Sequence, residues 1–279
     1  MIRRPESDAD FERCLAILRA VEPETGVDLE QLRASDGRLV LHGGGGYLYI
    51  APSSVSDGAY AMVRVEPTVR GRGIGSALLE AAREHARELG KTAIWGRISV
   101  DDEGSLGFAE RRGFEEVDRS VEHVRTLAAH DGELPDGVVE LTERHRAGAY
   151  AVAVECTPDM PTAGAAEAAP FDEWAADELA GPVAFAALDG DRVVGYAALR
   201  ALPATPNRLE HGLTAVLRAY RGRGIAQRLK RAQIAWAAAN GYRELLTSTS
   251  LRNAPMRAVN LKLGYEERPI DVLVRGPVT

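Results

Sequence analysis

The chain contains nearly the same glycine-rich segment twice, and this duplication constrains its fold more than any other feature. RGRGIG occupies positions 70–75 and RGRGIA occupies 221–226, so the two copies lie 151 residues apart. The same 151 residues separate Val65 from Val216, and Gly113 of GFEE from Gly264 of GYEE. A constant offset across about fifty residues indicates two copies of one structural unit with no net insertion between these landmarks.

The length is compatible with two domains. A chain of 279 residues that is 45% hydrophobic can bury a separate core in each half. The polar segment AAHDGELPDG at 128–137 contains glycine and proline and is typical of a linker. We therefore predict an N-terminal domain over residues 1–130 and a C-terminal domain over 131–279.

Each copy has the same predicted order of elements. A strand (59–65 and 210–216) leads into the glycine loop, and an amphipathic helix follows that ends at Gly90 or Gly241. Next come a second strand (92–98 and 244–250) and a short helix that ends in Gly-Phe or Gly-Tyr. Earlier in each half we predict a helix (11–21 and 147–155) and a hairpin with its turn at 34–37 or 188–191. The pattern predicts an α+β fold, or α/β in looser terms: a mixed, mostly antiparallel sheet flanked by helices in each domain.

Composition excludes several classes of function. The net charge of −7 argues against a nucleic-acid partner and is weakly compatible with cationic small molecules. The two cysteines form no disulfide or zinc motif, so no metal site is predicted. No apolar stretch approaches the ~20 residues that a membrane helix requires. We expect a cytoplasmic protein, monomeric or homodimeric, without a membrane partner.

A glycine loop between a strand and a helix can present backbone N–H groups to an anion, and the helix dipole adds to the attraction. Neither copy contains the Walker sequence GxxxxGK[ST]. The dinucleotide fingerprint GxGxxG fails in both copies because its third glycine would fall on Ser76 or Gln227. The pattern that fits both is Arg-x-x-Gly-x-Gly/Ala.

With its surroundings, this pattern resembles the GNAT superfamily of N-acetyltransferases. VEPTVRGRGIG (65–75) and VLRAYRGRGIA (216–226) resemble the loop motif of that superfamily. SLGFAERRGF (105–114) and NAPMRAVNLKLGY (253–265) resemble its later helix ending in Gly-aromatic. The resemblance covers both halves, a tandem architecture similar to that of the mycothiol synthases.

The resemblance implies acetyl-CoA as the cofactor and a primary amine of a small molecule as the acceptor. It also implies that the first strand of each copy separates from the second and leaves backbone groups for the pantetheine arm, near Val63–Val65 and Thr214–Val216. The pyrophosphate would be bound by the two glycine loops, with Asn253 as a further contact or merely a helix cap. The implied cofactor residues are Val63, Val65, Arg70, Gly71, Arg72, Gly73, Ile74, Gly75 and Ser76 in the first copy, and Thr214, Ala215, Val216, Arg221, Gly222, Arg223, Gly224, Ile225, Ala226, Gln227 and Asn253 in the second.

Catalysis by direct attack in a ternary complex needs a base for the amine, which titrates near ~10 as an alkylammonium. Members of the superfamily often carry a glutamate six residues before the last valine of the strand. Counting back gives Glu210 in the second copy and Ala59 in the first, so the second copy is predicted to be catalytic and the first degenerate. Members of the superfamily often use a tyrosine to protonate the thiolate. Ala109 stands at that position in the first copy and Asn260 in the second, and of the two only Asn260 can donate a hydrogen bond.

The acceptor is predicted to bind near TPDMPTAGAAEAAPFDEW (157–174), which contains no lysine or arginine. Asp159, Asp172 and Glu173 would attract a cationic acceptor, and Phe171 and Trp174 would stack on it or belong to the core. Two alternatives stay open. One is a non-catalytic, regulatory protein that binds acetyl-CoA, and the other is transfer of a longer acyl group.

Overall fold

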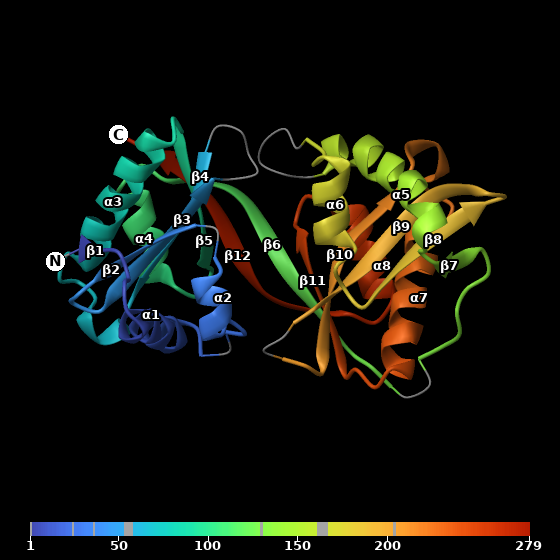
Figure 1. Cartoon of the computed structure of the whole chain (residues 1–279), viewed down its shortest axis with the longest axis horizontal. Helices are drawn as coiled ribbons and strands as arrows, with labels where there is room; N and C mark the ends of the chain where they lie inside the picture. Colours follow the sequence, from blue (N-terminus) through green and yellow to red (C-terminus); the bar gives the residue numbers. More distant parts are fainter. Residues whose placement is uncertain are drawn as a thin grey trace. The chain divides into compact units, whose positions relative to one another are not determined.

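The protein consists of two compact units in the computed structural model, and each unit is described by itself. Unit 1 comprises Met1–Arg119 and Asp271–Thr279, and unit 2 comprises Ser120–Ile270 (Figure 1). The structure describes residues 2–23, 25–35, 37–52, 58–128, 131–160, 167–202 and 205–279.

Unit 1 contains a mostly antiparallel sheet in the order β1-β2-β3-β4-β5-β12, in which only β4 and β5 run parallel. Its elements are β1 (Ile2–Arg3), α1 (Asp8–Val21), α2 (Leu29–Arg33), β2 (Arg38–His42), β3 (Gly46–Pro52), β4 (Gly58–Val65), α3 (Ile74–Glu88), β5 (Ala93–Ser99), α4 (Glu103–Glu110) and β12 (Glu266–Pro277).

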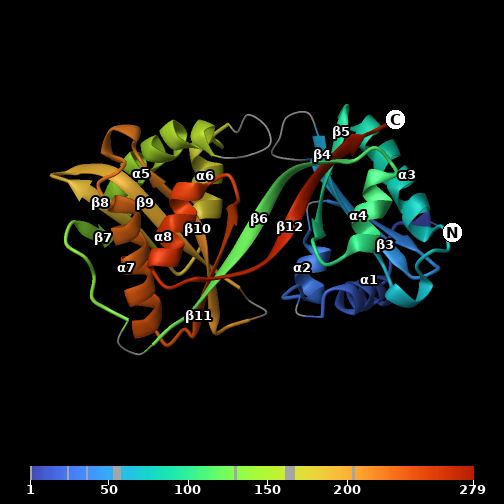
Figure 2. The same cartoon turned by 180° about the vertical axis from the view of Figure 1, so that it is seen from behind.

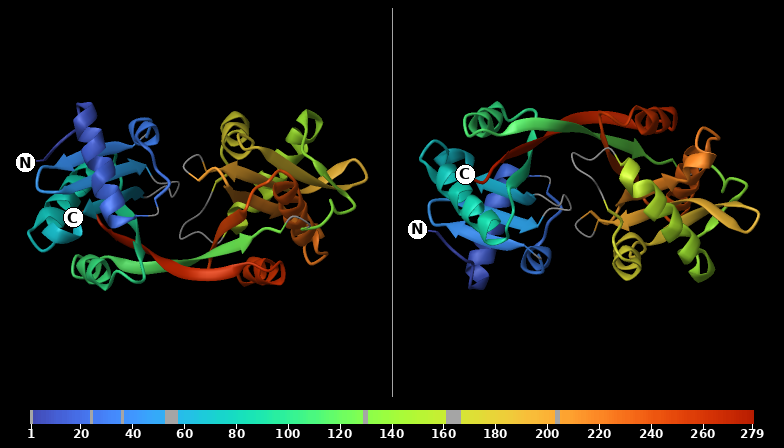
Figure 3. Two further views of the ribbon diagram at one scale, coloured as in Figure 1. Left: turned by 90° about the horizontal axis from the view of Figure 1, so that it is seen from below. Right: turned by 90° about the horizontal axis from the view of Figure 1, so that it is seen from above.

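Unit 2 repeats this plan in the order β6-β11-β10-β9-β8-β7, and only β10 and β11 are parallel. Helices α5 and α6 cover one face of the sheet, and α7 and α8 cover the other (Figure 2; Figure 3, left). The elements are β6 (Glu115–Thr126), β7 (Val138–Glu140), α5 (Glu143–Cys156), α6 (Phe171–Glu178), β8 (Val183–Asp189), β9 (Arg192–Ala201), β10 (Arg208–Val216), α7 (Ile225–Ala239), β11 (Glu244–Ser250) and α8 (Ala254–Lys262).

The closing strand of each sheet comes from the other sequence repeat. Residues 271–277 of β12 pair antiparallel with β5, and residues 120–126 of β6 pair antiparallel with β11. Both chain ends are accordingly marked on unit 1 (Figure 3). The units are therefore divided differently from the predicted domains 1–130 and 131–279, because residues 120–130 belong to unit 2 and residues 271–279 to unit 1.

The local elements follow the sequence with three differences. Helix α1 begins at Asp8, before the predicted Phe11, because Ser7 and Asp10 form a reciprocal cap there. Helix α5 begins at Glu143, where the Thr142 N–H donates to His145 Nδ1 at 3.1 Å. The first hairpin turns at residues 43–45 rather than at 34–37, and Gly45 takes a φ of +100° there. The second turns at 190–191, within the predicted 188–191.

The repeat is visible in the element bounds. Ile74 and Ile225 begin α3 and α7, and Ala93 and Glu244 begin β5 and β11, so both pairs keep the offset of the glycine loops. The ends of β4 and β10 keep this offset too, but β10 begins one position early and contains one extra residue. Among the described residues, no helix is long and apolar enough to cross a membrane.

Candidate functional site

The two glycine loops have the same backbone geometry. Gly71 and Gly73 have φ values of +77° and +81°, and Gly222 and Gly224 have +76° and +73°. Gly73 and Gly224 precede α3 and α7 directly, and neither helix has a side-chain cap at its start. A Cβ added at any of these glycines would meet nothing within 4 Å. Each helix N-terminus therefore has open space in front of backbone donors, which suits a phosphate group.

The loop arginines hold the loops in place. Arg70 Nε donates to the Val65 carbonyl at 3.3 Å, and Arg221 Nε donates to the Val216 carbonyl at 3.0 Å. Each guanidinium also pairs with an aspartate: Arg70 with Asp102 at 3.2 Å and Arg221 with Asp159 at 2.8 Å. These arginines thus tie the loop to the end of its strand, a role that the sequence pattern alone did not reveal.

The side chains at the remaining loop positions differ in burial and contacts. Ile74 and Ile225 are buried in the cores, so their side chains are not available to a ligand at the loop. Ser76 Oγ accepts from Arg112 at 2.7 Å, and the Arg112 guanidinium lies 3.7 Å from the ring centre of Phe108. The other predicted loop residues are exposed or half-buried: Arg72, Gly75, Arg223, Ala226 and Gln227.

Beside each loop, two parallel strands separate as the resemblance implied. Strands β4 and β5 pair only over 58–60 with 93–95, and β10 and β11 pair only over 208–210 with 244–246. Farther along, β5 and β11 stay paired with their other neighbours. The edges near Val63–Val65 and Thr214–Val216 therefore have no ladder partner on this side within the described strands. We call this separation in unit 2 the β10/β11 opening.

A β-bulge distinguishes β10 from β4. The register of β10 with β9 shifts between His211 and Thr214, whereas β4 pairs with β3 without a shift. The extra residue lies at Gly212–Leu213. Glu210 pairs with Leu246, and Tyr60 pairs with Trp95, which is the repeat equivalent of Leu246. The equivalent of Glu210 is therefore Tyr60 and not Ala59, the residue reached by counting.

Glu210 is half-buried at the last paired position before the opening. Its neighbours Leu209 and His211 point toward α7, since Leu209 packs in the cluster with Ile234 and His211 contacts Gln233. Successive strand residues alternate, so Glu210 points to the α6 side of the sheet. Arg200 lies directly opposite Glu210 on β9.

Glu178, which the sequence analysis missed, contacts the bulge. Its Oε2 accepts from the Leu213 N–H at 3.1 Å, and its Oε1 accepts from Arg200 at 2.6 Å. The carboxylate belongs to a residue only 9% exposed, near the end of α6. Gly212 makes room for it, because a Cβ there would lie 3.0 Å from Oε2. The available signal was the spacing from Trp174, which puts both residues on the buried face of α6.

Asn253 and Asn260 have different surroundings. Asn253 caps α8, with its Oδ1 accepting from the Met256 N–H at 3.2 Å. Asp102 occupies the equivalent place in unit 1 and accepts from the Ser105 N–H. Asn260 has no exposed surface, and its Nδ2 donates to Thr249 Oγ1 at 3.3 Å. Its Oδ1 has no hydrogen-bond partner in the described part of the chain.

The three predicted acceptor carboxylates are not equivalent. Asp159 is bound by Arg218 at 2.7 Å and by Arg221 at 2.8 Å, and these bonds lower its pKa to about 2. Two arginines balance the charge of Asp159, so we expect it to attract a cation less strongly than Asp172 or Glu173. Asp172 and Glu173 are exposed in the first turn of α6. Part of the predicted acceptor segment, 161–166, lies outside the described residues.

The aromatic pair of this segment divides between core and surface. Trp174 is 6% exposed, and its Nε1 donates to Tyr196 Oη at 3.0 Å, so it anchors α6 to the sheet. Phe171 is 38% exposed and packs edge-on against Tyr150. Only Phe171 is therefore available to an acceptor.

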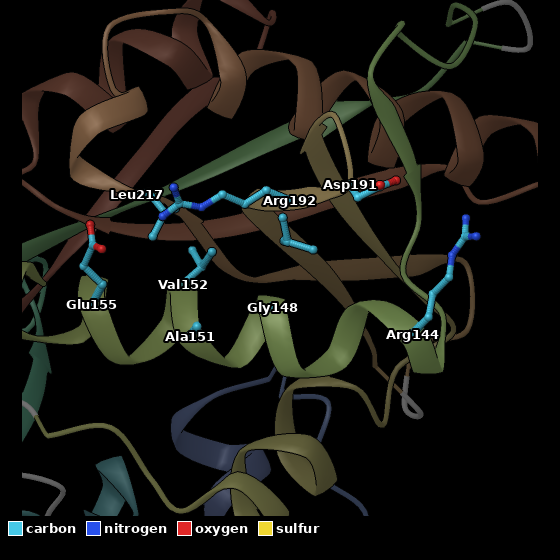
Figure 4. A pocket seen from close by; sticks show the side chains of 9 residues that line it. Arg144, Gly148, Ala151, Val152, Glu155, Asp191, Arg192 and Leu217 are labelled. Atoms are coloured by element: carbon cyan, nitrogen blue, oxygen red, sulfur yellow. The ribbon is translucent and has the colours of Figure 1, made fainter.

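A pocket of about 320 Å³ lies between α5 and the β8–β9 hairpin of unit 2, away from the bulge (Figure 4). Its charged lining residues are Arg144, Glu155, Asp191 and Arg192. Its lining includes Leu217, which follows β10, but no residue of Thr214–Val216 or of the glycine loop. We therefore do not assign the pocket to the candidate site.

Comparison with known proteins gives a consistent family assignment. The model of the acetyltransferase (GNAT) family matches residues 30–114 and 147–265, one segment in each repeat. An uncharacterized N-acetyltransferase of Methanocaldococcus jannaschii is 42% identical over 52 residues, which are 19% of this chain and 23% of that protein. The matched stretch thus spans about a quarter of this curated relative.

Two solved structures are similar along the whole chain. One is a GCN5-related N-acetyltransferase from Sphaerobacter thermophilus, with a TM-score of 0.78, 20% identity, and coverage of 100% of this chain and 95% of that one. The other is a tandem GNAT protein from the clavulanic acid biosynthesis pathway, with a TM-score of 0.76, 19% identity, and coverage of 100% and 99%. At these identities, the similarity concerns the fold.

Proposed function

Because the chain is an acyltransferase of the acetyltransferase (GNAT) family, we propose that unit 2 transfers an acetyl group from acetyl-CoA to a primary amine of a small molecule. The observation that carries the proposal is the convergence of three features on one strand. The glycine loop follows the end of β10, the open edge of β10 lies before it, and the bulge lies at the start of that edge.

The residues fit the donor. The N–H groups of residues 223–227 would hold the pyrophosphate, because the loop leaves space there and the helix dipole favours an anion. The backbone of Thr214–Val216 would bind the amides of the pantetheine arm, as a further strand would. The donor supplies an activated acyl carbon, and the chain's own residues orient it and move protons.

Glu210 is the proposed base. Its side chain lies on the α6 side of the sheet, and it is the last paired residue before the opening. It would take a proton from the ammonium form of the acceptor, directly or through water, so that the nitrogen lone pair can attack. Asp172 and Glu173 would attract the cationic acceptor to the same side.

Unit 1 is proposed to be catalytically degenerate. It has the loop and the separated strands, but β4 lacks a bulge, and the equivalent of Glu210 is Tyr60. The cap of α4 is also a charged aspartate, Asp102, where unit 2 has Asn253.

Calorimetric titration with acetyl-CoA, followed by a panel of amines with detection of the released thiol, tests the proposal. We expect at least one binding site per chain and thiol release that depends on an amine. Binding without turnover of any amine would favour the alternative of a regulatory acetyl-CoA-binding protein. Faster turnover with propionyl-CoA or butyryl-CoA than with acetyl-CoA would favour transfer of a longer acyl group.

A further inference from the structure

Unit 2 contains a buried lysine that the proposed reaction has not yet used. Lys230 lies on α7 and is 1% exposed. Its Nζ lies 5.6 Å from the ring centre of Tyr265. Within the described part of the chain, Nζ takes part in no hydrogen bond and no ion pair, and burial alone shifts its pKa. Burying an amine without a counter-charge is unfavourable, so the position calls for an explanation.

The ring beside Lys230 is held rigidly by a chain of hydrogen bonds. Gln233 Nε2 donates to the Ala198 carbonyl at 2.7 Å, so its Oε1 is the acceptor for His211 Nδ1, at 2.9 Å. His211 Nε2 must then accept from the Tyr265 hydroxyl. Burial, and next the charge of Lys230, hold the pKa of His211 well below its usual value, so this histidine is neutral. The network fixes Tyr265 but provides no partner for Lys230.

Other polar atoms on the α7 and α8 side of the sheet also have unused bonding capacity. Asn260 Oδ1 and Thr214 Oγ1 are buried without a hydrogen-bond partner among the described residues. Thr214 follows the bulge on β10, and Asn260 Nδ2 reaches Thr249 on β11. The side chains on both sides of the β10/β11 opening therefore have polar atoms available to a ligand.

Unit 1 serves as an internal control because its equivalent positions are all apolar. Equivalent residues of the two units are found from the constant offset of the repeat and, on the strands, from the register of strand pairing. The unit 1 equivalents are Leu79 for Lys230, Ala82 for Gln233, Ala109 for Asn260, Phe114 for Tyr265, Val63 for Thr214, Ala61 for His211 and Val274 for His123. Most of these form one hydrophobic cluster. The fold thus needs no polar group here, and the cluster is specific to the unit that we propose to be catalytic.

The cluster also lies where the reacting end of the donor is expected. His211 is the first residue beyond the last β10–β11 pair, and Val216 at the other end of the edge leads to the glycine loop. Five residues of strand span roughly 16 Å. An extended pantetheine arm that starts at the loop and follows this edge brings its sulfur toward the cluster. This step rests on the proposed function.

We propose that Lys230 is the acid that protonates the leaving sulfur of CoA. The amine nitrogen forms a bond to the acyl carbon, and the C–S bond breaks with its electron pair passing to sulfur. The ammonium of Lys230 gives one proton to that sulfur and becomes a neutral amine. The acceptor nitrogen loses two protons in all, one from its ammonium form before the attack and one after the C–N bond has formed. Both leave through Glu210 to solvent, and Lys230 takes one proton back from solvent for the next cycle.

The environment suits this role. Burial lowers the pKa of Lys230 to about 7, and an alkyl thiol titrates near ~8.5, so transfer from the ammonium to the thiolate is downhill. An acid with a pKa near neutrality is also readily recharged. Within the described residues, the titratable groups that interact with Lys230 are Tyr265, His211 and His123. His123 Nε2 in turn lies 3.4 Å from Glu267 Oε1, and Glu267 forms an ion pair with Arg257.

Replacement of Lys230 by methionine tests the role in turnover. Lys230→Met keeps the length of the side chain and removes the proton. We expect kcat to fall by ~10² or more while the Kd of acetyl-CoA changes by less than about twofold. The alkaline decline of kcat should also disappear in the variant. Leu79→Met in unit 1 is the matched control and should leave kcat unchanged.

Two outcomes would overturn the proposal. One is an unchanged kcat in Lys230→Met. The other is a wild-type preference for succinyl-CoA over butyryl-CoA that depends on Lys230, because the amine would then bind a carboxylate of the acyl group. Failure of wild-type protein to bind acetyl-CoA would instead refute the proposed function.

A second readout needs no donor. A lysine with a folded pKa of about 7 and an unfolded pKa of 10.5 binds fewer protons when folded between these values. Stability therefore rises with pH across this window. Lys230→Met should be more stable than wild type at pH 7, and denaturant titrations should show the difference shrinking toward pH 10. A difference that does not change with pH would refute the buried, depressed lysine on which the proposal depends.

Discussion

Three charged side chains on the α6 side of unit 2 lie around the bulge: Glu178, Arg200 and Glu210. Arg200 contacts Glu178 and faces Glu210 across the β9–β10 ladder. Glu178 accepts the Leu213 N–H, so its carboxylate fixes the conformation of the bulge. We interpret Glu178 as a positioning residue because its carboxylate holds both the bulge and Arg200, and we keep Glu210, at the last paired position before the opening, as the proposed base.

Replacement of Glu210 by glutamine separates these roles. Glu210→Gln keeps the size and removes the basicity, so we expect kcat/KM to fall by ~10² or more. The loss should shrink at high pH, where the acceptor amine is already neutral. Steady-state kinetics from pH 7 to pH 10 with the best amine provides the measurement. An unaltered rate near neutral pH would refute the assignment, and Glu116→Gln, far along β6, is a charge-matched control.

Most loop positions could be predicted from the sequence, but individual partners could not. The glycines were predictable because only glycine takes positive φ without strain, and RGRG repeats that requirement. The pairing of Asp159 with Arg218 and Arg221 was not predictable, since both arginines are distant from it in the sequence. The burial of Lys230 was hidden because a lysine within a helical pattern ordinarily lies on the exposed face.

At the scale of elements, the two glycine loops invite a direct comparison. Gly73→Val and Gly224→Val place the same side chain at similar φ values, +81° and +73°, so both variants carry similar strain of about 1–2 kcal/mol. In each, the side chain enters the space in front of the helix. We expect Gly224→Val to lose turnover by ~10² or more and Gly73→Val to retain it. Thermal denaturation checks that the strain is equal, and equal losses of turnover would refute the division of roles.

Helix α6 gives a second prediction at this scale. Asp172→Asn combined with Glu173→Gln removes two exposed charges while Trp174 keeps the helix anchored. KM for a cationic amine should rise several-fold, and more at low salt, because exposed charges act through a screened field. KM for acetyl-CoA should stay constant. Asp136→Asn combined with Glu143→Gln, at two other exposed positions, controls for net charge. An amine KM that moves at neither salt concentration excludes α6 as the acceptor surface.

The bulge illustrates why counting along the sequence failed at one element. Both copies end β4 and β10 at a valine, so counting back aligned Glu210 with Ala59. Because β10 has one extra residue at Gly212–Leu213, positions before the bulge align with β4 one residue later than counting suggests, and Glu210 aligns with Tyr60. A strand bulge leaves no fixed sequence signature, because it changes pairing rather than composition.

For the whole molecule, the exchanged closing strands were beyond prediction for a simple reason. Strands β6 and β12 are equivalent in the repeat, because their first residues, Glu115 and Glu266, are separated by the same offset as the glycine loops. Since both strands stand at the same place in the repeat, the sequence pattern does not say which sheet each of them closes. Only the pairing of 271–277 with β5 and of 120–126 with β11 decides between the arrangements.

The exchange predicts that the two halves fail to fold apart. A fragment of residues 1–130 lacks the strand that covers β5, and a fragment of residues 131–279 lacks the strand that covers β11. Each would expose an unpaired edge and tend to associate. We expect neither fragment alone to unfold cooperatively and the co-expressed pair to do so, by circular dichroism and gel filtration. A monomeric, cooperatively folded 1–130 fragment would contradict the prediction.

The same exchange determines the order in which the units can be completed on the ribosome. Residue 99 ends β5, but its neighbour begins at residue 271, so the whole chain between them must be translated first. At about 5–20 residues per second this takes roughly ten to thirty seconds. For β11 the order is reversed, because its partner, residues 120–126 of β6, is synthesised before β11 itself. Unit 2 can therefore be completed before unit 1, and nascent unit 1 must keep an open edge until β12 has left the exit tunnel.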